Sequence, residues 1–520
     1  MRIEIMDTTL RDGEQMQGVS YSPLEKLHIA SLLLTDVKVD RIEVASARVS
    51  SGEFEALSKI TEWARQNNLQ RKVEVLGFVD GELSLNWIYN AGGRVINLLC
   101  KGSLRHLEKQ LRKTPEQHVN DIKELIRKAE SLDMDVNIYL EDWSNGMIHS
   151  EDYVFYMMDS LRSEKVVRFM LPDTLGILNP DQTFSFCSKM VTRYPDLHFD
   201  FHAHNDYDLS VANVMAAIKA GVKGIHTTVN GLGERAGNAP LSSVTSLIRD
   251  HLNSEIGVVE SEITNVSKIV ETFSGIRIPV NKPVIGENVF TQTSGIHADG
   301  DSKDNLYFND LLPERFGRKR KYALGKQSGK ATIRKNLEEF GLDLNPESLA
   351  KVTQRVIELG DKKENVTTED LPFIISDVLG TEQINYKIFI KNYSLSLSSG
   401  LRPIASVQID IDGEIYEETS SGDGQYDAFM KALRKIYDML HKEFPLLTDY
   451  FVTIPPGGKT DALVETVISW NYSGMEFRTK GLDADQTESA IKATEKMLNI
   501  IENNELETKS KISLGEANKV

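Results

Sequence analysis

Two histidines in the segment Phe199–Tyr207 are the first residues whose type and spacing could do chemistry. The segment reads Phe-Asp-Phe-His-Ala-His-Asn-Asp-Tyr, and its apolar start is typical of a buried strand. Because successive side chains of a strand alternate between its faces, His202 and His204 point to the same side. Two imidazoles on one side make half of a divalent-metal site. Such a pair is more often a surface strand or a hydrogen-bonded core pair, so a metal site requires further ligands.

The elements that must position these histidines recur at regular intervals through the first part of the chain. Eight short apolar runs alternate with helical segments: Arg2–Met6, Arg41–Ala45, Val73–Val79, Val95–Cys100, Val136–Leu140, Val166–Leu171, His198–Phe201 and Gly224–Val229. This alternation predicts a parallel sheet, and eight units predict a closed (β/α)8 TIM barrel in residues 1–255. An open doubly wound sheet is the alternative. It would be favoured by a Gly-rich phosphate turn after the first strand, which Asp7–Gly13 (Asp-Thr-Thr-Leu-Arg-Asp-Gly) is not.

Polar side chains gather where the predicted strands end, which is where a barrel carries its chemistry. The candidates are Asp7, Arg11, Asp12, Glu43, Ser46, Tyr139, Glu141, Asp142, Asp173, Thr174, Asn205, Asp206 and the loop Asn230–Asn238. Each of them alone could be a helix cap or a loop residue. Their convergence on one barrel mouth predicts an active site there.

A metal site at this mouth would combine ligands from three strand ends. Asp12, His202 and His204 supply a carboxylate and two imidazoles, and Asn238 could reach in from the loop after the eighth strand. Two histidines and one carboxylate leave open positions for a small bidentate ligand such as a 2-oxo acid.

Three further residues could handle the substrate at the predicted mouth. Arg11 places a positive charge beside the metal, where it would stabilise a developing oxyanion. Thr174 could donate to a substrate carboxylate, and Glu141 is a candidate for proton transfer. The alternative for Arg11 is an ordinary ion pair with Asp12, and the alternative for Thr174 is a loop hydrogen bond.

The remainder of the chain has a different organisation. Residues 256–387 are predicted to be a helical linker with helices near 260–273, 330–340 and 346–359. Its basic run Arg315–Lys321 is interpreted as a solvated face, and the alternative is a contact to a phosphate-bearing ligand. Residues 388–506 form an α+β domain in which strands followed by a helix occur twice. The hairpin Ser406–Ile411 and Glu414–Thr419 turns at Asp412-Gly413. The polar residues 507–520 are expected to be a flexible tail.

Composition excludes several classes of protein. A net charge of −17 over 520 residues argues against general nucleic-acid binding. Two cysteines, Cys100 and Cys187, cannot form a disulfide framework and suit a reducing cytosol. No run approaches 18 apolar residues, so no membrane span is expected, and the strand at Arg2–Met6 leaves no room for a signal peptide. A cytoplasmic enzyme is the expectation.

Three motifs in order resemble those of one enzyme family. Asp7–Glu14 (Asp-Thr-Thr-Leu-Arg-Asp-Gly-Glu), His202-Ala-His204 and Gly231–Asn238 (Gly-Leu-Gly-Glu-Arg-Ala-Gly-Asn) are similar to those of the metal-dependent Claisen-condensing synthases. This family includes isopropylmalate, homocitrate and citramalate synthases, and the resemblance covers nearly the whole chain. It implies that Asp12, His202, His204 and Asn238 hold Mn²⁺, Mg²⁺ or Zn²⁺, and that acetyl-CoA is the co-substrate.

The same resemblance implies roles for further residues. Arg11 and Thr174 would bind the 2-oxo acid, with Tyr139 and Asn305 also at the substrate. His297 would help to remove a proton from the acetyl-CoA methyl group, aided by Tyr307 and Glu141. The linker would then reach over a barrel mouth, that of a partner subunit, which implies a homodimer. From its sequence context alone, His297 is a lone loop histidine with no assigned role.

The identity of the 2-oxo acid depends on the acyl pocket. Arg41–Ser50, Val75–Gly81, Leu98–His106 and Tyr139–Gly146 are most similar to the branch that condenses acetyl-CoA with pyruvate to (R)-citramalate for isoleucine synthesis. Leu76 and Leu99 would fill the space that an isopropyl group needs while admitting the methyl group of pyruvate. A methylene in such a pocket is worth roughly 1–3 kcal/mol. The alternatives are a 2-isopropylmalate synthase, which uses 2-oxoisovalerate, or two leucines that belong to the barrel core.

Two other classes of protein fit the sequence less well. A retro-aldol lyase on the same barrel would end near residue 300 and carry a catalytic cysteine in a Gly-rich loop. A ligand sensor without activity would be expected to lack Arg11 or a metal ligand.

The C-terminal domain resembles the regulatory domain of the family, which binds an end-product amino acid. Its effector-pocket stretches match Gly422–Asp427 and Asp449–Val464. The implied effector residues are Tyr426, Asp427, Leu447, Tyr450, Ile454 and Val464. Isoleucine is the expected effector.

Overall fold

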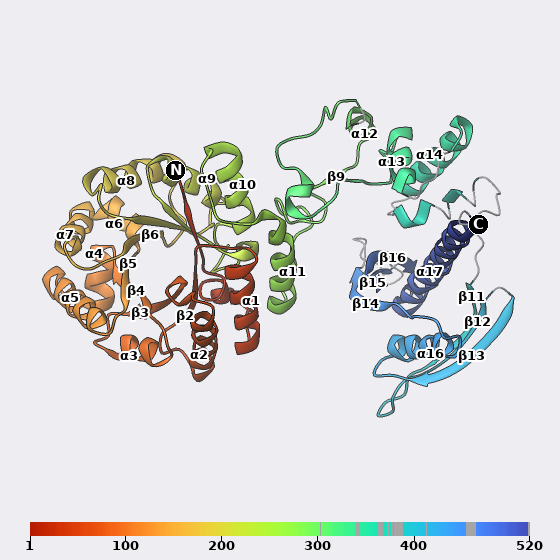
Figure 1. Ribbon diagram of the computed structural model, residues 1–520, viewed down its shortest axis with the longest axis horizontal. Helices are drawn as coiled ribbons and strands as arrows, with labels where there is room; N and C mark the ends of the chain where they lie inside the picture. Colours follow the sequence, from red (N-terminus) through yellow and green to blue (C-terminus); the bar gives the residue numbers. More distant parts are fainter. Residues whose placement is uncertain are drawn as a thin grey trace. The chain divides into compact units, whose positions relative to one another are not determined.

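The computed structural model describes residues 1–301, 303–339, 344–361, 366, 368–371, 374–375, 378, 388–411, 413–453 and 464–517 (Figure 1). The chain divides into two compact units. Unit one comprises residues 1–292 and 304–321, and unit two comprises 293–303 and 322–520. The linker predicted for residues 256–387 is therefore shared between the two units, and the limits set for the domains remain predictions.

Unit one contains the predicted barrel, closed by eight parallel strands in sequential order. The strands are β1 Glu4–Asp7, β2 Arg41–Ser46, β3 Val73–Phe78, β4 Val95–Lys101, β5 Asp135–Glu141, β6 Arg168–Asp173, β7 Phe199–Ala203 and β8 Gly224–Thr227. Each predicted run overlaps one of them, and β1 pairs with β8 to close the ring. The (β/α)8 prediction is confirmed.

Helices surround the barrel (Figure 1). They are α1 Pro23–Thr35, α2 Ser51–Gln66, α3 Leu83–Asn90, α4 Leu104–His106, α5 Pro115–Ser131, α6 Trp143–His149, α7 Glu151–Leu161, α8 Pro180–Arg193, α9 Ser210–Lys219, α10 Leu241–Leu252 and α11 Ile263–Ser274. Capping boxes followed by proline start α1, α5 and α8, at Ser22, Thr114 and Asn179. These local signals fix where the helices begin.

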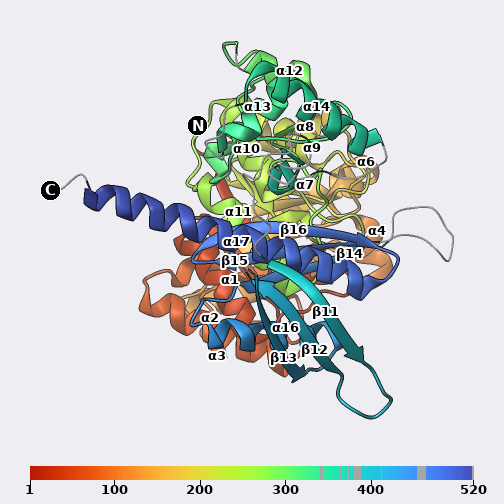
Figure 2. The same ribbon diagram turned by 90° about the vertical axis from the view of Figure 1, so that its right-hand side faces the viewer.

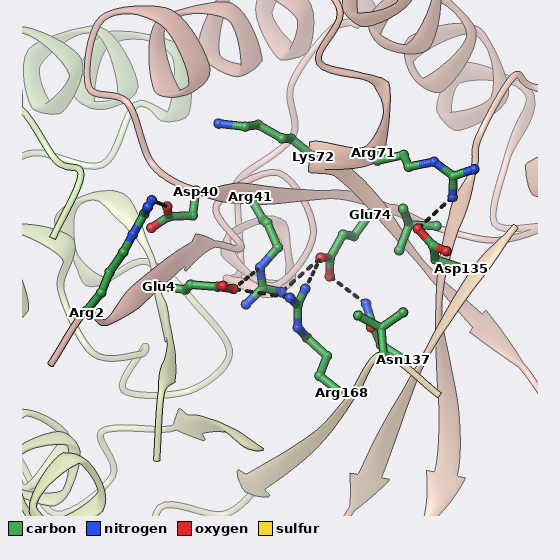
Figure 3. A pocket seen from close by; sticks show the side chains of 12 residues that line it. Arg2, Glu4, Asp40, Arg41, Arg71, Lys72, Glu74, Asp135, Asn137 and Arg168 are labelled. Carbon is green, nitrogen blue, oxygen red and sulfur yellow. Dashed lines mark hydrogen bonds and ion pairs between the residues drawn. The ribbon is translucent and has the colours of Figure 1, made fainter. Parts of the chain in front are cut away.

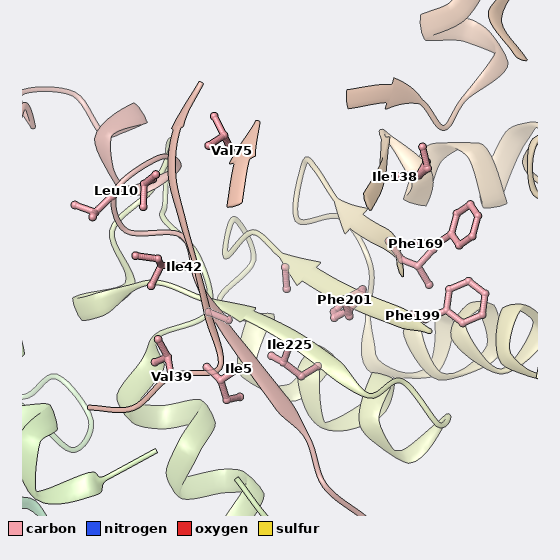
Figure 4. Close-up of a cluster of buried hydrophobic side chains, with 14 of the residues drawn as sticks. Ile5, Leu10, Val39, Ile42, Val75, Ile138, Phe169, Phe199, Phe201 and Ile225 are labelled. Atoms are coloured by element: carbon pink, nitrogen blue, oxygen red, sulfur yellow. The ribbon is translucent and has the colours of Figure 1, made fainter. Parts of the chain in front are cut away.

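The main core lies between the strands and the helices. Residues such as Ile5, Val75, Phe169 and Phe201 point outward from the strands into this layer and are buried (Figure 4). The alternate residues of the same strands point into the barrel, where the side chains are largely polar. The alternation of a strand thus separates packing outside the barrel from chemistry inside it.

Unit two holds small helices and a duplicated α+β arrangement. The helices are α12 Gly295–Asp301, α13 Lys330–Glu339 and α14 Pro346–Asp361. The strands are β11 Ile388–Ser396, β12 Ile404–Ile411 and β13 Glu414–Ser421, then β14 Leu446–Thr453, β15 Val464–Tyr472 and β16 Met475–Asp483. Helix α16 Gln425–Met439 packs on the first antiparallel sheet, and α17 Gln486–Ala517 packs on the second (Figure 2). The predicted repeat of strands followed by a helix is present.

Two features differ from what the sequence led us to expect. The basic run is not simply a solvated face, because Arg315 binds Asp250 and Glu260, and Arg318 donates to the carbonyls of Val284, Gly286 and Glu287. Helix α17 continues to Ala517, into the range expected to be a flexible tail. That range contains Glu and Lys and no Pro, a composition compatible with a helix. Among the described residues, no helix is long and apolar enough to cross a membrane.

Candidate active site

A tight turn after β1 presents Arg11 and Asp12 at the barrel mouth. The carbonyl oxygen of Thr8 accepts hydrogen bonds from the backbone N–H groups of Arg11, Asp12 and Gly13. Both side chains are buried, with Asp12 fully so. A buried charged pair at a strand end is costly unless it is used or neutralised, which makes this turn the first element of the site.

Strand β7 brings His202 and His204 to the Asp12 carboxylate. Nε2 of His202 lies 3.0 Å from Oδ2 of Asp12, Nε2 of His204 lies 3.8 Å from the same atom, and the two Nε2 atoms are 3.3 Å apart. Ligand atoms bound at about 2.1 Å in tetrahedral or octahedral geometry are separated by about 3.0–3.4 Å. The three side chains therefore converge as metal ligands would, and they form a buried Asp-His-His group.

Asn238 approaches the same point from the loop after β8. Its backbone forms a bridge with His204, and the loop turns at Gly237, where φ is +83° and a Cβ would lie 2.0 Å from the carbonyl oxygen of Gly231. Neither polar atom of the buried Asn238 amide has a hydrogen-bond partner among the described residues, nor does Oδ1 of Asp12. Such atoms are expected to be satisfied by a ligand, and a carboxylate, two imidazoles and an amide suit a divalent cation.

Burial and charge set the protonation of these groups. Burial opposes ionisation of Asp12, but the positive charge of Arg11 and the hydrogen bond from His202 outweigh it and hold the carboxyl pKa well below its usual value. Burial lowers the pKa of both histidines, to about 4 for His204. At neutral pH the group therefore offers one carboxylate and two neutral imidazoles, the forms in which these residues bind metals.

Arg11 is held on three sides beside this group. Its Nε donates to Glu43 at 2.7 Å, its Nη1 lies 3.1 Å from Asp12, and its Nη2 donates to the hydroxyl of Tyr139 at 3.3 Å. Burial alone would lower the pKa of Arg11, but the negative charges of Glu43 and Asp12 outweigh burial and raise this pKa above its usual value. The guanidinium is thus a fixed cation at the place where an oxyanion could be stabilised.

Leu76 and Leu99 lie inside the barrel rather than in the main core. They belong to a separate apolar cluster with Met6, Tyr139 and Met170. Because Tyr139 also contacts Arg11, this cluster borders the polar group. The side chains predicted to line the acyl pocket are therefore gathered by the fold.

Thr174 and Glu141 stand at neighbouring strand ends and already have partners. The hydroxyl oxygen of Thr174 accepts the backbone N–H of Asp142 at 2.9 Å, so its own proton can still be donated. This is the loop hydrogen bond considered as the alternative, and it does not prevent substrate binding. Glu141 pairs with Lys101, and its side chain is partly exposed.

The remaining predicted catalytic residues lie outside the barrel strands. His297 is on α12 in unit two, whereas Asn305 and Tyr307 follow α12 in unit one and are exposed. Their assignment to substrate binding and proton transfer remains a prediction.

The structure brings some of the predicted effector residues together and places others apart. The hydroxyls of Tyr426 and Thr494 are 2.7 Å apart, and the rings of Tyr426 and Tyr450 lie 5.4 Å apart. Leu447 pairs with Trp470, at the opposite end of β15 from Val464. Asp427 accepts the N–H of Asp423 and binds Lys431 at the start of α16, and Ile454 is outside the described residues. The effector assignment remains a prediction.

Sequence reasoning missed two buried residues inside the barrel. Asp200 and His226 bond each other, and His226 contacts Tyr139. A usable signal was present, since Asp200 is two residues before His202 and must share its face. Asp200 is near the start of β7, away from the strand end that carries His202 and His204.

Comparison with known proteins covers the whole architecture. The HMGL-like family matches residues 2–270, the homocitrate synthase post-HMGL domain-like family matches 284–364, and the LeuA allosteric (dimerisation) domain matches 365–502. Members of the first family are metal-dependent, in agreement with the Asp-His-His group of the barrel.

Individual relatives carry two different names. The (R)-citramalate synthase CimA of Methanocaldococcus jannaschii is 31% identical over 97% of this chain and 100% of that protein. The 2-isopropylmalate synthase of the same organism is 31% identical over 95% of this chain and 93% of that protein. The 2-isopropylmalate synthase of Pyrococcus furiosus is 32% identical, with coverages of 96% and 99%. Overall identity therefore does not distinguish the 2-oxo acids.

Proposed function

This chain belongs to the HMGL-like family, and its further domains are those of the LeuA and homocitrate synthase type, which condense acetyl-CoA with a 2-oxo acid. From this premise we propose that it uses pyruvate. The products are (R)-citramalate and free CoA, in isoleucine biosynthesis. The observation that carries the proposal is the apolar cluster that contains Leu76, Leu99 and Tyr139 beside Arg11. Two leucines next to the cation would admit a methyl group and restrict anything larger.

The barrel residues would divide the work as follows. A divalent ion, held by Asp12, His202, His204 and Asn238, would supply positive charge that polarises the 2-oxo group. Arg11 would bind the oxygen atoms of the 2-oxo acid, and the Thr174 hydroxyl would donate to its carboxylate. These contacts fix the acid with its methyl group against Leu76 and Leu99.

Proton transfer would be the task of a second set of residues. His297, with Tyr307 and Glu141, would remove a proton from the methyl group of acetyl-CoA. The resulting carbon nucleophile would add to C2 of pyruvate, and hydrolysis of the thioester would then release CoA. Glu141 lies at the end of β5, and its partner Lys101 keeps a positive charge next to it.

The decisive experiment measures free-CoA release with pyruvate, 2-oxoisovalerate and 2-oxoglutarate, each at several concentrations with a divalent metal. We expect the highest kcat/KM with pyruvate. A preference for 2-oxoisovalerate would overturn the proposal in favour of the 2-isopropylmalate synthase function. That second candidate is favoured by the two relatives of that name, which are as similar to this chain as the citramalate synthase is.

For regulation, we propose that isoleucine binds the C-terminal domain of a homodimer. The match to the LeuA allosteric (dimerisation) domain and the Tyr426–Tyr450 ring pair support this. Isoleucine should inhibit CoA release and leucine should not. Truncation after residue 387 should abolish inhibition while the barrel keeps its activity. Inhibition that survives truncation would place the effector site elsewhere, and a monomeric mass in light scattering would contradict the dimer.

A further inference from the structure

Nine buried or nearly buried polar side chains form a closed ring of contacts inside the barrel. In order around the ring they are Arg11, Glu43, Asn97, Asn137, Glu74, Arg41, Asp200, His226 and Tyr139, which returns to Arg11. Asn137, Glu74 and Arg41 line a cavity (Figure 3). They lie in the first half of their strands, at the opposite end of the barrel from the metal ligands, which lie at or beyond strand ends. The part with His226 and Tyr139 reaches the mouth.

The hydrogen bonds that connect Asp200, His226 and Tyr139 have donors and acceptors that can be assigned. Arg41 donates to Asp200 at 2.7 Å, and the Asp200 carboxylate lies 3.1 Å from Nε2 of His226. A carboxylate can only accept, so Nε2 carries the imidazole proton and Nδ1 keeps its lone pair. Nδ1 then accepts the hydroxyl proton of Tyr139 at 3.2 Å. The phenol oxygen is left to accept from Arg11.

This orientation determines what Arg11 can offer a substrate. Among the described residues its contacts with Glu43, Asp12 and Tyr139 engage three of the five N–H groups of a guanidinium. Two N–H groups remain, in a plane set by those contacts. A guanidinium fixed in this way is pre-organised to hold a carboxylate or an enolate-like oxygen pair.

We propose that His226, backed by Asp200, is a positioning residue for the condensation. It directs the Tyr139 hydroxyl so that its oxygen accepts from Arg11, and the guanidinium is thereby aimed at the 2-oxo acid. The inference rests on the proposed function, because it names how the same site orients its 2-oxo acid. His226 itself does not touch the substrate and acts through Tyr139.

Tyr139 gives this arrangement a second consequence. Its ring belongs to the apolar cluster with Leu76, while its hydroxyl joins Arg11 to His226. Tyr139 thus connects the apolar wall next to the methyl group of the 2-oxo acid to the Arg11 cation next to its oxygen atoms. Fixing its hydroxyl fixes both surfaces relative to each other.

The test compares His226→Leu, His226→Asn and the matched control Asn137→Leu in the full-length enzyme. Asn137 is equally buried in the same ring but bonds Asn97 and Glu74 instead. Steady-state kinetics give KM for pyruvate and for acetyl-CoA, and calorimetry gives the Kd of pyruvate in the presence of metal without acetyl-CoA.

We expect His226→Leu to raise the KM and the Kd of pyruvate by about tenfold, the size of one lost hydrogen bond to a charged group. The KM of acetyl-CoA should stay within about twofold. His226→Asn can still accept from Tyr139 and should recover most of the loss. Asn137→Leu should leave both pyruvate constants unchanged. Equal effects in His226→Leu and Asn137→Leu, or no change in His226→Leu, would overturn the inference.

A double-mutant cycle separates positioning from general damage. Tyr139→Phe removes the hydroxyl through which His226 acts, so His226→Leu should have no further effect on pyruvate binding in that background. Additive losses would mean that His226 does not act through Tyr139. If the wild type condenses none of the three 2-oxo acids, the proposed function fails, whereas the pyruvate Kd series still decides the role of His226.

Discussion

The two ends of the barrel interior are both rich in buried charge, yet they are built differently. At the end away from the metal ligands, Arg168 faces Glu4 and Glu74, and Arg41 faces Glu74 and Asp200, around a cavity of about 290 Å³ (Figure 3). At the mouth, Arg11 faces Asp12 and Glu43 in the same way, but two imidazoles also converge on the Asp12 carboxylate. Neither polar atom of the nearby Asn238 amide has a hydrogen-bond partner among the described residues.

The difference teaches how to distinguish structural charge from functional charge. Cations that each face a carboxylate offset the cost of their own burial and need no ligand. Two imidazoles and an amide that gather at one carboxylate are instead the ligand types of a divalent cation. Charge density alone would have ranked the two ends equally, and the way in which the carboxylates are paired, with guanidinium groups at one end and with imidazoles at the other, separates them in agreement with the rule for barrel faces.

The largest expected effect is the loss of activity when the mouth loses Arg11. Arg11→Met should lower kcat/KM for the 2-oxo acid by about 10²–10³, as expected for a lost oxyanion-stabilising group. Arg11→Lys keeps the charge but cannot contact Glu43, Asp12 and Tyr139 together, and it should recover little of the activity. CoA-release kinetics check both variants. Full recovery by lysine would mean that the fork geometry is unimportant.

A second prediction concerns His118, a buried histidine in α5 outside both ends. Its Nε2 accepts the N–H of Lys101 at 3.1 Å, and burial lowers its pKa to about 4. Between pH 4 and 6.5 the unfolded chain therefore binds a proton that the folded chain does not. The free energy of unfolding therefore has its full value above pH 6.5 and decreases by about 3 kcal/mol as the pH falls to 4.

Urea unfolding of His118→Gln across this range should show a correspondingly flatter pH profile than the wild type. The same depressed pKa is found for His204, but we expect a divalent metal to alter the NMR titration of His204 and not that of His118. A metal response at both residues would remove the distinction between a packed histidine and a ligand.

A third prediction concerns the opposite end of the barrel, where we expect a loss of stability and not of activity. Arg168→Met removes one of the two guanidinium groups that face Glu4 and Glu74, leaves Arg41 as the other, and should cost about 2 kcal/mol of stability. Specific activity of the folded enzyme should stay within about twofold, because these charges lie at the opposite end of the barrel from the metal ligands. Denaturant unfolding and CoA release measure the two quantities on one sample. A large loss of activity without a loss of stability would assign function to this end.

The sequence predicted the features that depend on local order along the chain. The eight strands follow from apolar runs, and Asp12, His202 and Asn238 were gathered because strand ends meet at one barrel face. The side of a strand on which a residue lies was equally predictable, and it places Asp200 beside His202.

Contacts across the barrel could not be predicted in this way. The bonds from His226 to Tyr139 and from Arg41 to Asp200 depend on the tilt and stagger of strands far apart in the chain. Leu447 and Val464 are far apart because of the register between β14 and β15. The sequences of the two effector-pocket stretches do not specify this register. The interpretation of the basic run as a solvated face does not hold for Arg315, because the carboxylates that bind this residue precede it by 55 and 65 residues.

The smallest expected effect tests whether the mouth also selects its substrate. Leu76→Ala removes part of the wall next to Tyr139 and should raise the ratio of kcat/KM for 2-oxoisovalerate over pyruvate by about tenfold. Val75→Ala is the matched control, since Val75 is the preceding residue on β3 and packs in the main core between strands and helices. It should lower stability and leave the ratio unchanged. If both variants shift the ratio alike, selection follows from the general looseness of β3; if neither does, Leu76 is barrel core, and the pairing pattern that locates the site does not extend to the choice of acid.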